Sequence, residues 1–138
     1  MAEASVTPEA SVASPGLGIR TIGCHVYAYS GLFTATTSYQ DVLSFQSPAG
    51  YIVGILQLNS GIDAAAPGNR VTNAANIIFN GITIARLAAG TNTDDSPTSE
   101  TQDLLIPPLT IVTVEVDSSA SSDRQFSVTF IGRVYGAE

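Results

Sequence analysis

The feature that most constrains this chain is a strict alternation of apolar and polar residues near its C-terminus. β-Branched or aromatic side chains occupy every second position in two segments, and they are Val112, Val114, Val116, Phe126, Val128 and Phe130. A period of two predicts strands that bury one face and expose the other. The stretch from residue 104 to residue 135 therefore predicts two antiparallel strands of a β-sandwich or barrel, with these six side chains in its core.

Further strands are predicted upstream at residues 19–29, 41–45 and 51–58. In the first strand, Ile22, Cys24, Val26 and Ala28 are expected on one face, and His25, Tyr27 and Tyr29 on the other. The segment 51–58 is apolar on both faces, with Ile52, Leu56 and Leu58 opposite Tyr51, Val53 and Ile55. A strand that is apolar on both faces is covered on both faces, and we expect the second cover to come from another chain.

A hairpin is predicted between residues 75 and 87, because Asn80-Gly81 separates two apolar segments. Asn and Gly tolerate the positive φ that a two-residue type I′ turn requires at both positions. The expected register pairs Phe79 with Ile82 and Ile77 with Ile84, which gives one shared apolar face.

Short strands separated by turn signals, without a convincing helix, predict an all-β fold. About eight strands suit a jelly-roll-like β-sandwich. An immunoglobulin-like sandwich is the main alternative, but the chain has no Trp and one Cys, so it lacks the buried Trp and the Cys pair of that fold. With 138 residues, we expect one β-sandwich domain at 19–138, preceded by an extended N-terminal arm at 1–18.

The arm consists mostly of Ala, Ser, Val, Glu and Pro, and it repeats the tetrapeptide Glu-Ala-Ser-Val at residues 3–6 and 9–12. Such a segment buries too little apolar surface to offset the entropy of ordering it, so we expect no structure in the arm alone. It has neither a basic region nor an apolar stretch of the kind that a signal peptide contains.

The composition favours a surface covered by other protein. Charged residues are 12% of the chain, about half the usual share of roughly 25%. A surface rich in Thr, Ser and Asn is the alternative explanation. The net charge is −7 and the five basic residues are scattered arginines, which argues against nucleic acid and against an anionic membrane as partners.

Catalysis, metal binding and cofactor binding receive little support. His25 is the only histidine and Cys24 the only thiol. Because adjacent strand residues point to opposite faces, these two cannot form a catalytic dyad. A hydrolase that uses a serine–His25–carboxylate triad is the catalytic alternative. No nucleophile-elbow pattern is present. An acidic loop of Asp94, Asp95, Glu100 and Asp103 could hold calcium through carboxylate oxygens, although its spacing fits no known calcium loop. We expect a protein that is not an enzyme and has no cofactor.

Candidate interface residues lie on the predicted outward faces. His25, Tyr27 and Tyr29 form a stripe that could stack on a sugar, but Tyr and His are also common at protein contacts. The full candidate set is His25, Tyr27, Tyr29, Tyr51, Val53, Ile55, Arg133 and Tyr135. We further expect a mixed face on the two C-terminal strands, with Thr113, Glu115, Thr129, Ile131, Arg133 and Tyr135, where a neighbour could bind.

These features together resemble the small jelly-roll decoration or cement proteins of tailed-phage capsids. The residues that carry the resemblance are the arm 1–18, the Asn80-Gly81 hairpin, and the ending from Ile106-Pro107-Pro108-Leu109 through Phe130-Ile131-Gly132-Arg133-Val134-Tyr135-Gly136. The resemblance implies a homotrimer on the outer capsid surface of the virion. It also implies that the protein clamps neighbouring subunits of the major capsid protein, with the arm crossing a subunit boundary.

The charge of the arm bears on this interpretation. Coat proteins that package RNA usually carry a basic arm that neutralises phosphates, whereas this arm carries Glu3 and Glu9 and no basic residue. We therefore expect an external or inter-subunit role. A carbohydrate- or receptor-binding sandwich of a phage fibre or tail is the alternative, based on Tyr27 and Tyr29.

Overall fold

A computed structural model describes residues 19–60, 72–90, 98–119 and 125–136, so the arm lies outside the described residues. The described residues form ten strands: β1 (Arg20–Ile22), β2 (His25–Tyr29), β3 (Phe33–Thr34), β4 (Gln40–Gln46), β5 (Tyr51–Ser60), β6 (Thr72–Phe79), β7 (Ile82–Gly90), β8 (Thr98–Ile106), β9 (Ile111–Ser118) and β10 (Gln125–Tyr135). None of these residues is helical. A search of this part of the chain for a long apolar helix that could cross a membrane finds none.

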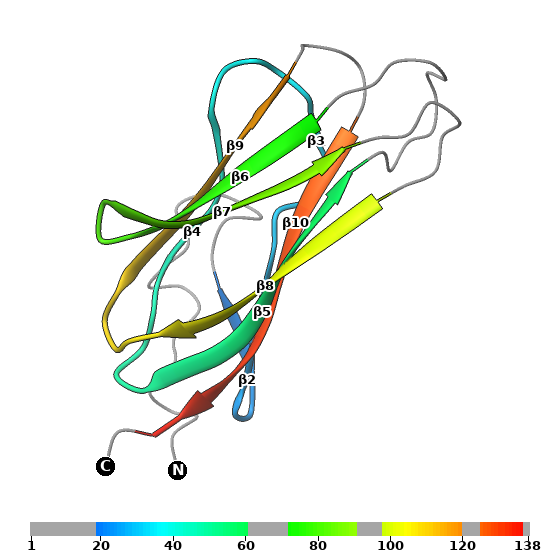
Figure 1. Ribbon diagram of the computed structural model, residues 1–138. Coiled ribbons are helices and arrows are strands. Elements are labelled where there is room, and N and C mark those ends of the chain that lie inside the picture. Colours follow the sequence, from blue (N-terminus) through cyan, green and yellow to red (C-terminus); the bar gives the residue numbers. More distant parts are fainter. Residues whose placement is uncertain (1–18, 61–71, 91–97, 120–124, 137–138) are drawn as a thin grey trace.

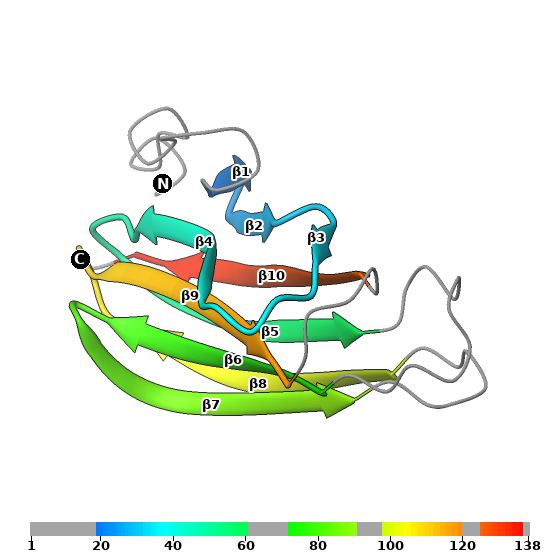
Figure 2. The ribbon, with the colours of Figure 1, turned by 90° about the horizontal axis from the view of Figure 1, so that it is seen from above.

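The strands form two antiparallel sheets packed face to face (Figure 1). Sheet A has the order β1-β2-β10-β5-β8, with β3 also paired to β10, and sheet B has the order β4-β9-β6-β7. The long strand β10 lies alongside β5 over most of its length (Figure 2). The all-β prediction is therefore confirmed, with ten strands in place of about eight.

The pairing of the eight main strands is that of a jelly roll. Four antiparallel pairs are nested along the chain, namely β6 with β7, β5 with β8, β4 with β9, and β2 with β10. Such nesting describes one long hairpin, and rolling it up adds the contacts of β10 with β5 and of β9 with β6. Two sheets that share this rolled connectivity form the double-sheet jelly roll. The short strands β1 and β3 account for the difference from eight.

The predicted core is confirmed, since Val112, Val114, Val116, Phe126, Val128 and Phe130 are each at most 1% exposed. The predicted mixed face on these strands is wrong. β9 lies in sheet B and β10 in sheet A, so Thr113 and Glu115 lie on the opposite side of the sandwich from Ile131 and Arg133. Alternation shows which side of a strand is buried, but it does not show to which sheet the strand belongs.

The predicted single strand at 19–29 is a hairpin of β1 and β2. Ile22 pairs with His25, and Gly23 has a φ of +59°, which is the left-handed conformation that a tight turn needs and that Gly adopts readily. Val26 and Ala28 are buried as expected, but Ile22 is 68% exposed. Cys24 lies in the turn and is half-buried, so neither Ile22 nor Cys24 belongs to the core face.

The Asn80-Gly81 hairpin is confirmed in its turn and corrected in its register. Both turn residues have positive φ, 51° and 84°, and Phe79 pairs with Ile82 as predicted. Ile77 pairs with Ala85, because a β-bulge shifts the register beside it. The shared apolar face therefore does not form: Ile77 is fully buried, whereas Ile82 and Ile84 are exposed.

Candidate functional site

The structure places all eight predicted interface residues on one surface, the solvent side of sheet A, which we call the outer face. His25, Tyr27 and Tyr29 come from β2, and three more come from the middle of β5 and its start. The β10 residues Arg133 and Tyr135 complete the set. The alternation of each strand predicted which side chains point outward, and the shared sheet brings them together.

The strand register arranges these side chains in rows across the sheet, because cross-strand partners share a face. One row is Ile22, His25, Arg133, Val53 and Leu105. The next is Arg20, Tyr27, Ile131, Ile55 and Asp103. Tyr135 is paired with Tyr51 at one end, and Tyr29 with Thr129 on the other side of the two rows. The outer face therefore forms one continuous surface over β1, β2, β10, β5 and β8.

Large apolar side chains are concentrated on the outer face. Of the fourteen that are exposed among the described residues, eight lie here: Ile22, Tyr29, Tyr51, Val53, Ile55, Leu105, Ile131 and Tyr135. Val53 and Ile55 are each 49% exposed and Ile131 is 56% exposed. A contiguous exposed apolar surface on a small domain marks an interaction site more often than it marks ordinary surface.

Two large apolar residues of this surface were missed as interface candidates in the sequence. Ile22 was assigned to the core because the turn at Gly23 was read as strand. Leu105 was part of an apolar run, Leu104-Leu105-Ile106, in which the apolar residue pointing outward cannot be told from its buried neighbours by composition. The strand β8 that carries Leu105 begins at Thr98, well before the apolar run, and its polar first half gave no strand signal.

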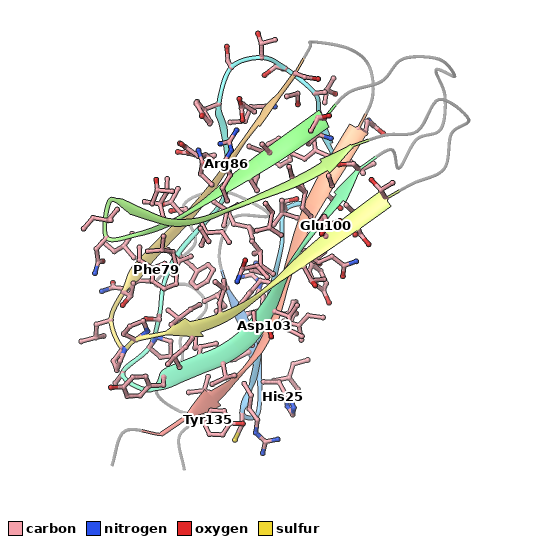
Figure 3. All side chains as sticks on the ribbon, in the orientation of Figure 1. His25, Phe79, Arg86, Glu100, Asp103 and Tyr135 are labelled. Atoms are coloured by element: carbon pink, nitrogen blue, oxygen red, sulfur yellow. The ribbon has the colours of Figure 1, made fainter. Side chains whose placement is uncertain are left out.

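The charges of the outer face differ from those of the whole chain. Arg133 and Arg20 lie on it with His25, and Asp103 is the one acidic residue of the described chain in its rows. His25 and Tyr135 lie toward the same end of sheet A, with Asp103 farther along, whereas Arg86 lies over sheet B (Figure 3). The surface therefore combines exposed apolar groups with a local excess of positive charge.

A hollow of about 390 Å³ lies at the centre of the outer face. Its walls are the side chains of His25, Val53, Ile55, Asp103, Ile131 and Arg133, and Gly54 and Gly132 lie between them. These two glycines are paired across β5 and β10. A Cβ on Gly54 would lie 2.6 Å from the carbonyl oxygen of Ile131 and 2.7 Å from the ring of Phe130. Glycine is required here because the two strands and a core ring approach closely.

The aromatic stripe does not form a flat platform. The rings of Tyr27 and Tyr29 are 5.1 Å apart between centroids and are inclined at 45° to each other. Tyr27 is half-buried, and Tyr29 is 51% exposed. Sugars stack best on exposed rings that present a common plane, so this pair is better suited to lateral packing against a protein side chain.

The predicted acidic loop is wrong in its second half. Glu100 and Asp103 lie on β8 and pair with β5, whereas Asp94 and Asp95 lie outside the described residues. On the solvent side of sheet B, two acidic residues lie beside polar neighbours. Arg86 donates a hydrogen bond of 2.6 Å to Asn76 Oδ1 and lies 3.5 Å from Asp117 Oδ1, and Asn76 donates to Glu115 over 3.4 Å.

No protein family matches the sequence, and no curated protein matches it either. Comparison of the fold with solved structures does find similarities. A chain of infectious bursal disease virus, Gx strain, aligns with a TM-score of 0.51 at 12% identity, over 91% of this chain and 36% of the viral chain. This chain thus spans about a third of the viral one.

Two other structures are less similar. Eiger TNF from S. frugiperda has a TM-score of 0.43 at 15% identity, over 81% of this chain and 94% of its own. The CBM36-1 domain of a multidomain xylanase from the hindgut metagenome of Trinervitermes trinervoides has a TM-score of 0.40 at 14% identity, over 93% and 85%. These two TM-scores are too low to support a conclusion about this chain. The viral chain shares the fold, and at this identity nothing more than the fold.

Proposed function

We propose that this protein is a non-enzymatic structural component of a virus particle, a capsid decoration or cement protein of a tailed phage. In this role it forms a homotrimer on the capsid surface and binds neighbouring subunits of the major capsid protein, without nucleic acid, membrane or cofactor as partner. The observation that carries the proposal is the outer face of sheet A, where eight of the fourteen exposed large apolar side chains lie together.

The energy available from this surface is of the same order as the cost of association. Full burial of a large apolar side chain contributes roughly 1.5–3 kcal/mol, so a half-exposed one contributes about half of that. Eight such side chains would contribute roughly 6–12 kcal/mol, which is comparable with the estimated cost of 4–15 kcal/mol for lost rigid-body freedom. Burial of this face in a contact can therefore offset most of the cost of forming that contact.

The jelly roll shared with a chain of a virus is consistent with a role in a particle. The trimer and the tailed-phage assignment derive from the resemblance of the arm, the hairpin and the C-terminal segment. Only 12% of the residues are charged. This low share supports a protein whose surface is largely covered by other protein when it is assembled.

The proposal is tested with two matched variants. Ile55→Asp places a charge on the outer face, and Ile84→Asp places one on β7 at nearly the same exposure, 49% and 48%. We expect Ile55→Asp to lower the mass measured by size-exclusion chromatography with light scattering, and to reduce co-sedimentation with empty capsid shells at least tenfold, because a charge would be buried in the contact. Ile84→Asp should behave as wild type. A wild-type protein that is monomeric and does not bind any shell would refute the proposal.

The carbohydrate-binding alternative has less support in the geometry. It needs a stacking surface, and the inclined rings of Tyr27 and Tyr29 do not provide one. The lining of the hollow does not favour a sugar over a protein, because its apolar side chains, Val53, Ile55 and Ile131, are matched by as many polar ones, His25, Asp103 and Arg133.

A further inference from the structure

The outer face of sheet A and the chain as a whole have charges of opposite sign. The chain carries a net charge of −7. Two of the three arginines in the described residues, Arg20 and Arg133, lie on the outer face beside His25, and Asp103 is the one described acidic residue in the rows around them. The face is therefore suited to an acidic and apolar partner segment, since complementary charge determines orientation and rate of association.

The N-terminal arm has this chemistry. Residues 1–18 contain Glu3 and Glu9 and no basic side chain, and the two repeats place Val6 and Val12 three residues after each glutamate. Glutamate and valine thus alternate at a spacing of three residues, which is one turn of a polyproline II segment. In that conformation a single side of the arm would present both carboxylates and both valines.

The arm is long enough to span the outer face and to extend beyond its edge. Eighteen residues extend at most about 60 Å, at roughly 3.3 Å per residue. The arm joins the fold at Ile19, next to β1 at the edge of sheet A. Three strand spacings separate β1 from β5, which is about 15 Å at 4.8 Å per strand. The reach of the arm therefore exceeds the width of the face severalfold.

We propose that the arm of one copy binds the outer face of a neighbouring copy, with Glu3 or Glu9 against Arg133 and His25. Val6 or Val12 then packs into the hollow between Ile55 and Ile131, over Gly54. This inference rests on the proposed function. That function uses the outer face for contact between copies, and the arm of a neighbouring copy would lie within this contact. Exchange of a terminal segment between copies is a low-cost route to a closed oligomer.

The experiment reverses charges in the full-length protein and measures oligomer mass by light scattering across a dilution series. Arg133→Glu alone, and Glu3→Arg with Glu9→Arg, should each weaken association about tenfold or more, because a like charge then opposes the arm. Combining the reversals in one chain should recover much of the loss. Mixing the arm variant with the face variant should recover only part of it, because a mixed trimer keeps at least one contact between two copies of the same variant. Arg86→Glu, which changes an arginine on sheet B, should leave the mass unchanged. Circular dichroism checks that each variant is folded.

The outcomes separate this inference from the proposed function. If wild type is oligomeric but either single reversal leaves its mass unchanged, the arm does not bind a neighbour through Arg133, and the proposed function stands. If both reversals weaken association without recovery on combination, the direct pairing is refuted. A third outcome is an arm that covers the outer face of its own chain. The reversals then change the contact between arm and face within one chain but leave the oligomer mass unchanged, which also refutes the proposal.

Discussion

Buried polar side chains join the two sheets at the end where β5, β6 and β9 meet. Asn73 is fully buried and donates a hydrogen bond of 2.8 Å to Ser60, and it accepts one of 2.5 Å from Ser118. Ser60 in turn donates to the carbonyl of Ala89 over 3.0 Å. Ser60 belongs to sheet A and the other residues to sheet B. Every polar group of Asn73 in this cluster has a partner, so it links the sheets without leaving a buried group unsatisfied.

Asn73→Leu should reduce the free energy of unfolding by about 1–3 kcal/mol, because the hydroxyls of Ser60 and Ser118 lose their partner in a dry site. Urea denaturation followed by circular dichroism measures the change. Asn59→Leu is the control: Asn59 is half-buried and its hydrogen bond to Ser127 is 3.3 Å long, so a change well below 1 kcal/mol is expected. Equal effects of the two substitutions would show that the buried cluster contributes no more to the free energy of unfolding than the hydrogen bond of Asn59 does.

At the scale of single residues, the sequence predicted well which side chains are buried, but it predicted poorly which residues they contact. The alternation identified Val112 and Phe126 as core and Val53 and Arg133 as outward, because the backbone alone determines which side chains share a strand face. Asn73 was not singled out, since an asparagine in a polar segment carries no sign of being buried. Its burial depends on Ser60 and Ser118, which are distant in the chain.

The strands themselves show why β5 and β10 lie so close. Gly54 and Gly132 face the core side directly opposite each other, and the ring of Phe130 fills the space above Gly54. On the opposite side of the sheet, the hollow is surrounded by outward side chains, among them Val53, Ile55, Ile131 and Arg133. The pair of glycines lies beneath this hollow and serves the packing of the core.

Gly54→Ala should destabilise the fold by about 1–3 kcal/mol, since the added Cβ overlaps with backbone and with an aromatic ring that cannot both move. Thermal unfolding would show a lower Tm. Val53→Ala, at the adjacent position on the exposed side, should lower the Tm much less. If Gly54→Ala is as stable as wild type, the close approach of the two strands is looser than the structure indicates.

Turn chemistry explains which elements were predictable. Asn80-Gly81 gave the hairpin of β6 and β7, because two positive φ values admit few residue types. The bulge beside Ile77 has no such signal, so the register beyond the first pair was wrong. Gly23 is a single glycine within an apparently regular strand, and only its φ shows that β1 and β2 are separate.

The core of the described residues begins at residue 19. Ile19 is 1% exposed, and the other buried apolar side chains of these residues follow it in the chain. Deletion of residues 1–18 should therefore leave a cooperative thermal transition with a Tm within a few degrees of wild type, while association is weakened. Calorimetry and light scattering measure the two effects. Loss of the cooperative transition would mean that the arm contributes to the core.

The whole fold was predictable to the level of an all-β sandwich, and the jelly roll from the number of strands. The assignment of strands to sheets was not, since β9 and β10 are consecutive in the chain but belong to different layers. Topology depends on which distant segments pair, and one sequence holds no record of those pairings. The alternation within each strand predicted its outward side chains. Only the pairing of the strands in sheet A shows that these side chains form one continuous surface.

The nested pairing has a consequence for how the protein is made. The strands can close outward from the Asn80-Gly81 turn, because each pair, once formed, shortens the loop that the next must close. β10 is the last of the described strands along the chain, so β2 and β5 can pair with it only after the other strands have been synthesised. It is also the central strand of sheet A and supplies Ile131, Arg133 and Tyr135 to the outer face. Until β10 has been synthesised, the outer face lacks its middle strand and is incomplete.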